Sequence, residues 1–239
     1  MTALALRVIK QILGDKRTIA MMLLAPILIL TLFATGTATE TIFDNYAYIF
    51  LSIIAFFLIF IVSGMALVRE RVTGTLERML MTPVTRTGIV TGYALGYGLF
   101  AAIQAVVLVL FTIYVLGAPN KGNIFWIIII MLLLAIAAVS FGELLSIFST
   151  TEFQVVQLIP LTIVPQIFFS GIIPLDSFPS HLGNLAYIMP IYLGAEAVRI
   201  VMKAAGGFSD MWHYMAALLA YIIALNMLNA LALRKYRKT

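Results

Sequence analysis

Long runs of apolar residues dominate this chain, and short polar stretches separate them. A helix needs roughly 20 apolar residues to cross the hydrocarbon core of a bilayer. Six runs reach or approach that length, and only the fourth contains an acidic or basic side chain, that of Glu143. The pattern predicts an all-α membrane protein with one transmembrane domain over residues 1–239. The predicted spans are residues 19–36, 46–68, 87–116, 124–148, 155–173 and 212–233.

The segment before the first span, residues 1–17, has the pattern of an amphipathic helix. At 100° per residue, the apolar positions 4, 5, 8, 9 and 12 share one arc, and Arg7 and Lys10 lie opposite. Such a helix is typical of the membrane interface. The alternative is a helix that packs on the protein's own cytoplasmic loops.

The third predicted span carries Gly88, Gly92 and Gly96 at four-residue spacing. Small residues in such a stripe let helix backbones approach closely inside a membrane. We expect the stripe to pack within the chain, rather than to form a dimer seam.

A charged stretch, residues 69–86, interrupts the apolar pattern between the second and third spans. If residues 70–82 form a helix, apolar positions 72, 76, 79 and 80 cluster on one side and charged positions 70, 71, 77 and 78 on the other. A plain connector needs no apolar stripe. The pattern therefore favours a surface that docks another protein, although a solvated connector stays possible.

The stretch between the fifth and sixth spans is too long for a turn and too apolar for a free loop. Pro174, Pro179 and Pro190 divide it into short pieces. Irregular backbone at membrane depth survives only where protein or a water-filled cavity covers it. We expect re-entrant or interfacial helices on the outer side of the membrane.

Composition supports the membrane interpretation, because 63% of the 239 residues are hydrophobic and only 10% are charged, against about 25% charged in soluble domains. Twelve of the 15 basic residues fall in the N-terminal flank, the 69–86 stretch and the C-terminus, which predicts that both termini are cytoplasmic. The net charge of +5 thus reflects membrane orientation and not a nucleic-acid partner. Without cysteine, and with only two histidines, the chain offers no evident metal site.

Three stretches, in their order along the chain, resemble the ABC-2-type transport permeases of the drug-efflux-like branch, which are membrane subunits of ATP-driven exporters. They read LGDKRTIAMMLLAPILILTLF, VRERVTGTLERMLMTPVTRTGIVTG and FFSGIIPLDSFPSHLGNLAYIMPIYLGAEAVRIV. The resemblance covers essentially the whole chain. Tyr93 departs from it, since relatives often carry lysine there.

The resemblance implies a coupling helix that sits in a cleft of a separate ATPase, with a second contact at Thr151 and Glu152. It also implies an outer gate that includes Ser170, Gly171, Pro174, Pro179 and Pro190. The residues expected at the ATPase are Glu70, Arg71, Val72, Gly74, Thr75, Leu76, Glu77, Arg78, Met79, Leu80 and Pro83.

The nucleotide chemistry is expected on a partner. A P-loop needs a glycine followed directly by Lys and then Ser or Thr, and this chain has no such sequence. The resemblance implies that a cytoplasmic ABC ATPase uses ATP and Mg²⁺, that this chain binds no cofactor, and that two permeases, identical or paralogous, form one pathway in the plasma membrane. A hydrophobic drug-like or lipid-like substrate fits the apolar chain, although polysaccharide and peptide exporters share this architecture.

Two other function classes compete. An ion-coupled secondary transporter or channel would use an ionisable group inside the membrane. Glu143 is the candidate, with Gln104 and Gln166 as further pathway residues, although Glu143 lies near a span end, where its carboxylate could reach water. A membrane enzyme could pair Ser170 with His181 or His213, but no third orienting group is evident.

Overall fold

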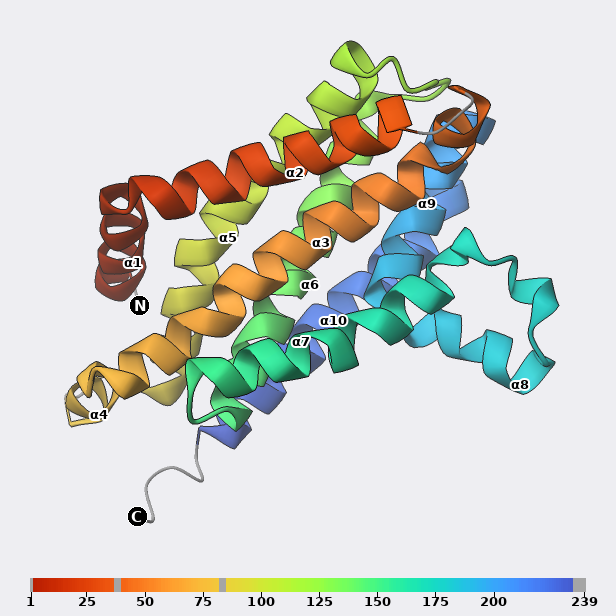
Figure 1. Ribbon diagram of the computed structural model, residues 1–239. Coiled ribbons are helices and arrows are strands. Elements are labelled where there is room, and N and C mark those ends of the chain that lie inside the picture. Colours follow the sequence, from red (N-terminus) through yellow and green to blue (C-terminus); the bar gives the residue numbers. More distant parts are fainter. Residues whose placement is uncertain (1, 37–39, 82–84, 234–239) are drawn as a thin grey trace.

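A computed structural model describes residues 2–36, 40–81 and 85–233, and this described part is helical, without strands. Helices α1 and α4 lie at one end of an elongated bundle and α8 lies at the other (Figure 1). We call these the α4 end and the α8 end. The elements are α1 (Thr2–Gly14), α2 (Lys16–Gly36), α3 (Glu40–Val72), α4 (Thr75–Leu80), α5 (Arg86–Leu110), η1 (Phe111–Val115), α6 (Ile124–Phe148), α7 (Glu152–Ile167), η2 (Phe168–Ile172), η3 (Leu175–Ser177), α8 (Ser180–Gly183), η4 (Asn184–Ile188), α9 (Pro190–Ala204) and α10 (Phe208–Ala232).

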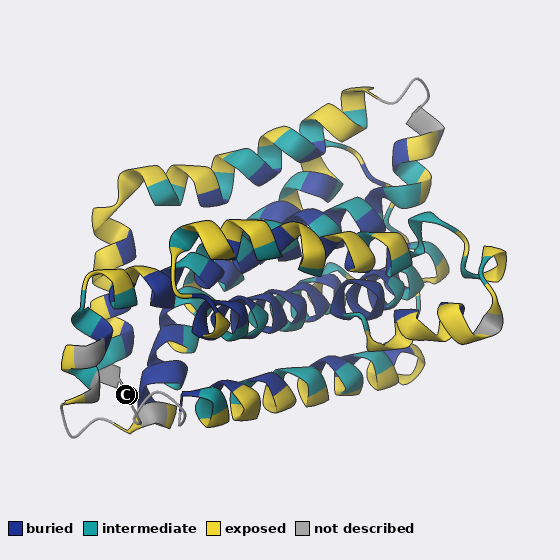
Figure 2. Cartoon of the chain, turned by 60° about the horizontal axis from the view of Figure 1, so that its bottom comes forward, coloured by how far each residue is buried: buried dark blue, intermediate teal, exposed yellow. Residues whose placement is uncertain are grey.

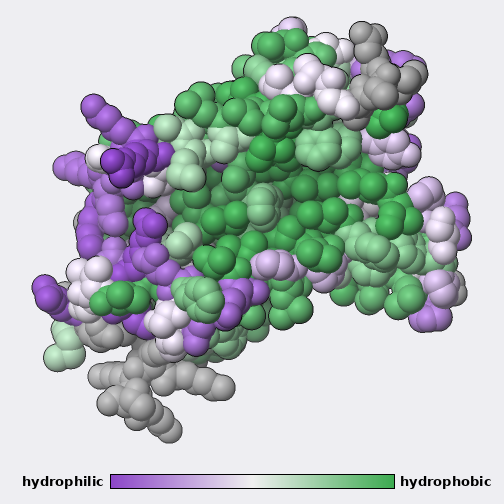
Figure 3. Space-filling view, viewed as in Figure 1, coloured by the Kyte–Doolittle hydropathy of each residue, from purple (hydrophilic) through white to green (hydrophobic). Residues whose placement is uncertain are grey.

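The six predicted spans are confirmed as helices. Within the described residues, six helices are long and apolar enough to cross a membrane. Figure 3 shows a broad hydrophobic band on the visible face, between two more hydrophilic ends. The spans begin and end within about four residues of the predicted limits, and 124–148 matches α6 at both ends. The protein is therefore a multi-pass membrane protein.

Helix α6 lies at the centre of the bundle, and it packs most extensively against α3. Buried residues gather along the middle of the bundle, whereas the outer helices expose one face (Figure 2). A Cβ added at Gly142 of α6 would overlap the Ser63 hydroxyl and lie 2.6 Å from the Phe60 carbonyl oxygen, so the two backbones touch. Close approach at a small residue is how helices associate where lipid offers no hydrophobic drive.

Helix α1 packs on α5 through the predicted glycine stripe. A Cβ at Gly92 would lie 2.8 Å from Leu4, and one at Gly96 would lie 2.5 Å from Val8. Leu4, Val8 and Ile12 thus turn the apolar side of α1 toward the protein. The stripe packs within the chain, as expected. That α1 also lies in the membrane interface stays a prediction.

At the α8 end the chain is broken into short pieces, as the prolines predicted. Gly171, inside η2, takes a left-handed conformation at φ 95°, which kinks the helical run that continues from α7. Residues His181–Ile188 and Pro190–Ala204 then meet at 82°, the geometry of a broken span or a re-entrant loop. Helix α9 is largely buried against α3, α6 and α10. Helix α9, the last part of the predicted outer segment, is thus part of the core, whereas η3, α8 and η4 are mostly exposed.

One element differs from its predicted bounds. The expected helix over 70–82 is wrong, because Glu70, Arg71 and Val72 belong to α3 and only Thr75–Leu80 form a separate helix. Gly74, at φ 69°, produces the break, since a left-handed glycine commonly terminates a helix.

Candidate docking site at the end of α3

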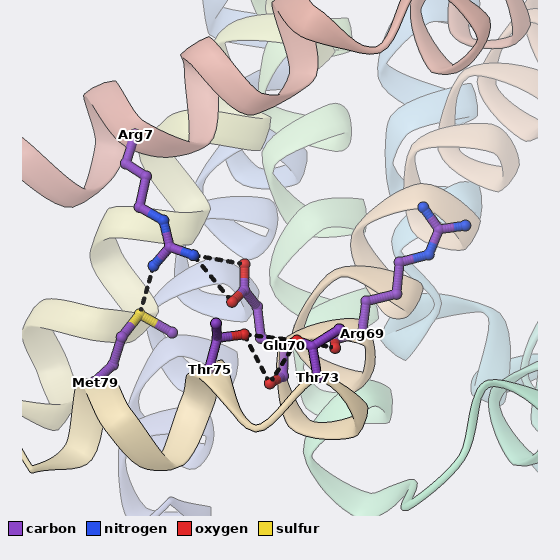
Figure 4. Close-up of polar contacts among 6 residues, drawn as sticks. All are labelled: Arg7, Arg69, Glu70, Thr73, Thr75 and Met79. Carbon is purple, nitrogen blue, oxygen red and sulfur yellow. Dashed lines mark hydrogen bonds and ion pairs between the residues drawn. The ribbon is translucent and has the colours of Figure 1, made fainter.

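The last turn of α3 and the short α4 form a compact hairpin of helices at the α4 end. The backbone N–H groups of Thr73 and Gly74 bond to carbonyls of α3, and the hydroxyls of Thr73 and Thr75 donate to the carbonyl oxygen of Glu70 at 3.2 and 3.0 Å (Figure 4). These bonds satisfy carbonyl groups of the last turn of α3, which have no partner within the helix because the helix ends there. The orientation of α4 is therefore fixed by α3.

Glu70 joins this hairpin to α1. Its carboxylate is 5% exposed and accepts from the Arg7 guanidinium at 3.2 and 3.4 Å (Figure 4). The same guanidinium points to the Met79 sulfur of α4, at 3.2 Å. Glu70 therefore presents no outward charge in this structure, because its carboxylate is buried and paired inside the chain. Its contact with an ATPase stays a prediction.

Arginines flanking Glu70 connect α3 to the segment between α6 and α7. Arg71 donates to the carbonyl oxygens of Ser149 and Ile147, and the Val68 N–H donates to the Ser146 hydroxyl at 2.8 Å. Arg69 lies 3.4 Å from the Glu152 carboxylate. The end of α3 thus contacts α1, α6 and α7. Arg71, like Glu70, serves an internal contact.

Among the described side chains, fewer face outward from the hairpin than the sequence predicted. Leu76 is only 3% exposed and packs with Val8, Ile89 and other core residues, so it does not belong to an outward apolar stripe. Val72 is 63% exposed but lies on α3. Arg78 is exposed, whereas Gly74, Thr75 and Met79 are intermediate. The side chains of Glu77 and Leu80, and the whole of Pro83, lie outside the described residues.

Sequence reasoning missed two members of this site. Met81 is 89% exposed, directly after α4, and adds the apolar surface that Leu76 does not provide. The position of Met81 near the end of the charged stretch could have identified it. A continuous helix over residues 70–82, however, would point Met81 away from the apolar stripe. Arg7 was assigned to the polar side of α1, and nothing in the sequence paired it with Glu70.

The predicted second contact lies next to the hairpin. Thr151 caps α7 by accepting from the Gln154 N–H at 3.2 Å, and Glu152 pairs with Arg69 as above. Phe148 and Phe153 are each 69% exposed on either side of this turn. The two contacts predicted separately are linked through Arg69 at the end of α3, and we treat Val72, Arg78, Met81, Thr151 and Glu152 as one candidate surface. We call it the docking surface.

The predicted outer-gate residues lie together in the broken segment at the α8 end. Ser170 is buried, and its hydroxyl donates to the Ile167 carbonyl oxygen at 2.7 Å. Pro174 precedes η3, the carbonyl oxygen of Pro179 accepts from two N–H groups of α8, and Pro190 begins α9. The structure supplies Ser170 with a backbone partner and places no described cluster of potential metal ligands near it.

The three predicted pathway residues are all buried, each on a different helix. Gln104 lies on α5, Glu143 on α6 and Gln166 on α7, with exposed fractions of 1, 0 and 2%. Their side-chain oxygens and nitrogens have no hydrogen-bond partner among the described residues. The expectation that Glu143 reaches water is wrong, because α6 lies at the centre of the bundle.

The chain is similar in sequence to several known proteins. The chain is 28% identical to ABC transporter G family member 20 of Dictyostelium discoideum over 84% of its own length, and 28% identical to the inner membrane transport permease YhhJ of Escherichia coli over 75%. It is 26% identical to the probable multidrug ABC transporter permease YbhR of Escherichia coli over 67%.

These alignments cover 29, 48 and 44% of the three relatives, so the chain spans less than half of their length. The family model for the ABC-2 type transporter matches residues 1–203, which include α1, the docking surface and most of α9. The chain therefore belongs to the ABC-2 type transporter family.

Proposed function

We propose that this chain is the permease subunit of an ATP-driven exporter, powered by a separate cytoplasmic ATPase. The observation that carries the proposal is the α3–α4 hairpin, which exposes Val72, Arg78 and Met81 while its base is tied to three other helices. An apolar contact with charged groups at its rim is the usual form of a protein interface.

The contacts at the end of α3 would carry movement from the ATPase into the membrane. A displacement of α4 acts on α3 directly, on α1 through Arg7 and on α7 through Arg69 and Glu152. Because these links join whole helices, the bundle would respond as packed rods that shift together.

The remaining parts of the proposal follow from family membership. Two permeases, identical or paralogous, would form the pathway, and the ATPase would use ATP and Mg²⁺ while this chain binds no cofactor. The α4 end and both termini would face the cytoplasm of a plasma membrane. The substrate class is a hydrophobic drug-like or lipid-like molecule, supported by the apolar spans and by the multidrug relative YbhR.

Affinity purification from native membranes in mild detergent tests this function. We expect a P-loop ATPase in about equal amount with the wild type, identified by mass spectrometry. The double variant Arg78→Glu and Met81→Asp should lose it. Tyr187→Asp, an exposed residue at the α8 end, is the matched control and should keep it. A folded wild type that brings down no ATPase would overturn the exporter function. Retention by the double variant would instead overturn the docking surface.

Glu143 gives a second candidate function, an ion-coupled transporter or channel. A carboxylate without a partner inside a membrane bundle is costly, and such groups commonly serve ion or proton pathways. No described group forms a hydrogen bond with its carboxylate and could pass a proton on. We therefore rank this function second.

A further inference from the structure

Helix α1 lies across the α4 end of the bundle, at a steep angle to the first spanning helix, α2 (Figure 1). Asp15 alone separates the two helices. A helix that crosses the end of a bundle of spanning helices runs along the membrane surface and not through the membrane. Each side of α1 therefore meets a different environment.

One side of α1 packs on the protein, and the apolar side next to it is left open. Leu4, Val8 and Ile12 pack on α5 and its neighbours. Leu6 and Leu13 are 57 and 56% exposed, and they lie about 20° apart around the helix at 3.6 residues per turn. Two adjacent leucines that the described chain leaves uncovered are stabilised when another apolar environment takes them up.

The direction of this open side indicates the hydrocarbon of a lipid leaflet. Arg7 points from α1 to Glu70 and to Met79 of α4, so that side of α1 faces the tip of the bundle (Figure 4). Leu6 and Leu13 lie about 100–120° around α1 from Arg7, away from the tip. With one side on α5 and one toward the tip, the open leucines face the layer that surrounds the spans.

Three basic side chains border this open side, Lys10 on α1 and Lys16 and Arg17 at the start of α2. All three are exposed, and none of these side chains forms an ion pair in the described part of the chain. The one acid among them, Asp15, caps α2 by accepting from two backbone N–H groups and the Thr18 hydroxyl. Three cations and one carboxylate leave a net charge of +2 beside the leucines.

The combination of open leucines and excess positive charge selects the class of lipid. A zwitterionic leaflet accepts the leucines but offers no net charge to the basic groups. An anionic leaflet satisfies both, because its surface potential attracts basic segments that adjoin it. Figure 3 shows the same division, with hydrophilic side chains at the corner where α1 meets α2 and apolar side chains along the spans.

We propose that α1 and the start of α2 bind anionic phospholipids. The lipid phosphates contact Lys10, Lys16 and Arg17, and the acyl chains surround Leu6 and Leu13. This inference goes beyond the proposed function and does not rest on it. Because Arg7 of the same helix binds Glu70, lipid that holds α1 also helps to hold the end of α3 and α4.

The test measures quenching of a fluorophore on α1 by brominated lipid. The chain has no cysteine, so bimane on Leu13→Cys reports a single position. The labelled permease is placed, without an ATPase, in nanodiscs of equal parts phosphatidylglycerol and phosphatidylcholine, of which only one lipid carries bromine on its acyl chains. We expect an apparent binding constant about fivefold higher for phosphatidylglycerol, the effect of one basic residue near an anionic surface. Salt at about 1 M should weaken this preference.

Three variants keep the result interpretable. Combining Lys10→Gln, Lys16→Gln and Arg17→Gln should bring the ratio of binding constants to about one, without loss of quenching by phosphatidylcholine. Lys121→Gln, an exposed residue before α6 at the far end of the bundle, is the matched control and should keep the preference.

The third variant moves the label to Gly14→Cys. A Cβ there meets nothing within 4 Å, and the position lies on the side of α1 that carries Arg7. Both brominated lipids should quench this label less than the label at position 13. Each labelled variant must elute as a single folded species.

Three results would overturn the proposal. Equal quenching by the two lipids would show that the leaflet is not selected by charge. Quenching by neither lipid would show that protein, such as a second copy of the chain, covers this side of α1. A preference that the triple glutamine variant retains would show that these basic groups do not bind the lipid. No arm measures ATPase binding, so failure of the proposed function leaves each of these results unchanged.

Discussion

The Arg7 guanidinium donates to both carboxylate oxygens of Glu70, at 3.2 and 3.4 Å, across 63 residues of chain. The arginine is 44% exposed, whereas the glutamate is 5% exposed. The pair therefore neutralises a charge that water does not reach. It also fastens α1 to the last turn of α3, directly beside α4.

Loss of Arg7 should destabilise the α4 end. In Arg7→Ala, Glu70 stays buried without its partner, which costs about 1–3 kcal/mol of unfolding free energy. We expect a lower apparent unfolding temperature in detergent, followed by intrinsic fluorescence. Lys10→Ala, also exposed on α1, is the control and should leave it unchanged. If Arg7→Ala unfolds at the wild-type temperature, the pair does not contribute to stability.

This pair also shows where prediction from sequence stops. Hydrophobic runs of about 20 residues predicted all six spans, because the bilayer fixes their length. The partner of Glu70 lies on another helix, however, and helical periodicity carries no information about which helices pack together. The prediction that Leu76 belongs to an outward apolar stripe failed for the same reason. Its apolar character was evident, but only the fold shows that it faces Ile89 of its own chain instead of a partner protein.

The contact between α1 and α5 should depend on Gly96. In Gly96→Ala the new Cβ would lie 2.5 Å from Val8, and relieving that overlap costs about 1–3 kcal/mol. Adding Val8→Gly removes both clashing atoms, the Cγ1 at 2.5 Å and the Cβ at 2.7 Å, so the double variant should lose less stability than the sum of the two single variants. Apparent unfolding temperatures of the four proteins measure this coupling.

A nearby glycine provides the matched control for this comparison of single and double variants. A Cβ at Gly98, on the same helix, meets nothing within 4 Å. Gly98→Ala should therefore stabilise the protein by about 0.5–1 kcal/mol, the helix-propensity difference. Equal effects of alanine at positions 96 and 98 would show that α1 does not pack on α5 as described.

At the close approach of α3 and α6, alanine should destabilise the protein much more at Gly142 of α6 than at Gly64 of α3. In Gly142→Ala the Cβ would overlap the Ser63 hydroxyl and lie 2.8 Å from the Gly64 nitrogen, so backbone would have to move. In Gly64→Ala the nearest atoms are 3.5 Å away, an ordinary contact. We expect Gly142→Ala to lose about 3 kcal/mol or more and to give little folded protein, and Gly64→Ala to purify as the wild type. Size-exclusion yield of the two variants measures this, and equal yields would contradict the packing.

Glu143→Gln separates the two candidate functions. Glutamine matches the shape of glutamate but cannot carry a proton or a charge through the cycle, so the packing around this buried position should be kept. In inverted membrane vesicles, an ATP-driven exporter should accumulate a fluorescent amphiphile upon ATP addition at the same rate in the variant as in the wild type. A secondary transporter should instead accumulate it when a proton gradient is imposed without ATP, and Glu143→Gln should abolish that transport.

The comparison is informative because both energy sources act on the same vesicles. Glu143 lies in the central helix, 0% exposed, and no described side chain donates to its carboxylate. If the group is only structural, ATP-driven uptake persists in Glu143→Gln and the gradient drives none in either protein. If gradient-driven uptake appears in the wild type and disappears in the variant, Glu143 is part of the coupling pathway. The docking surface would then need a partner other than an ATPase.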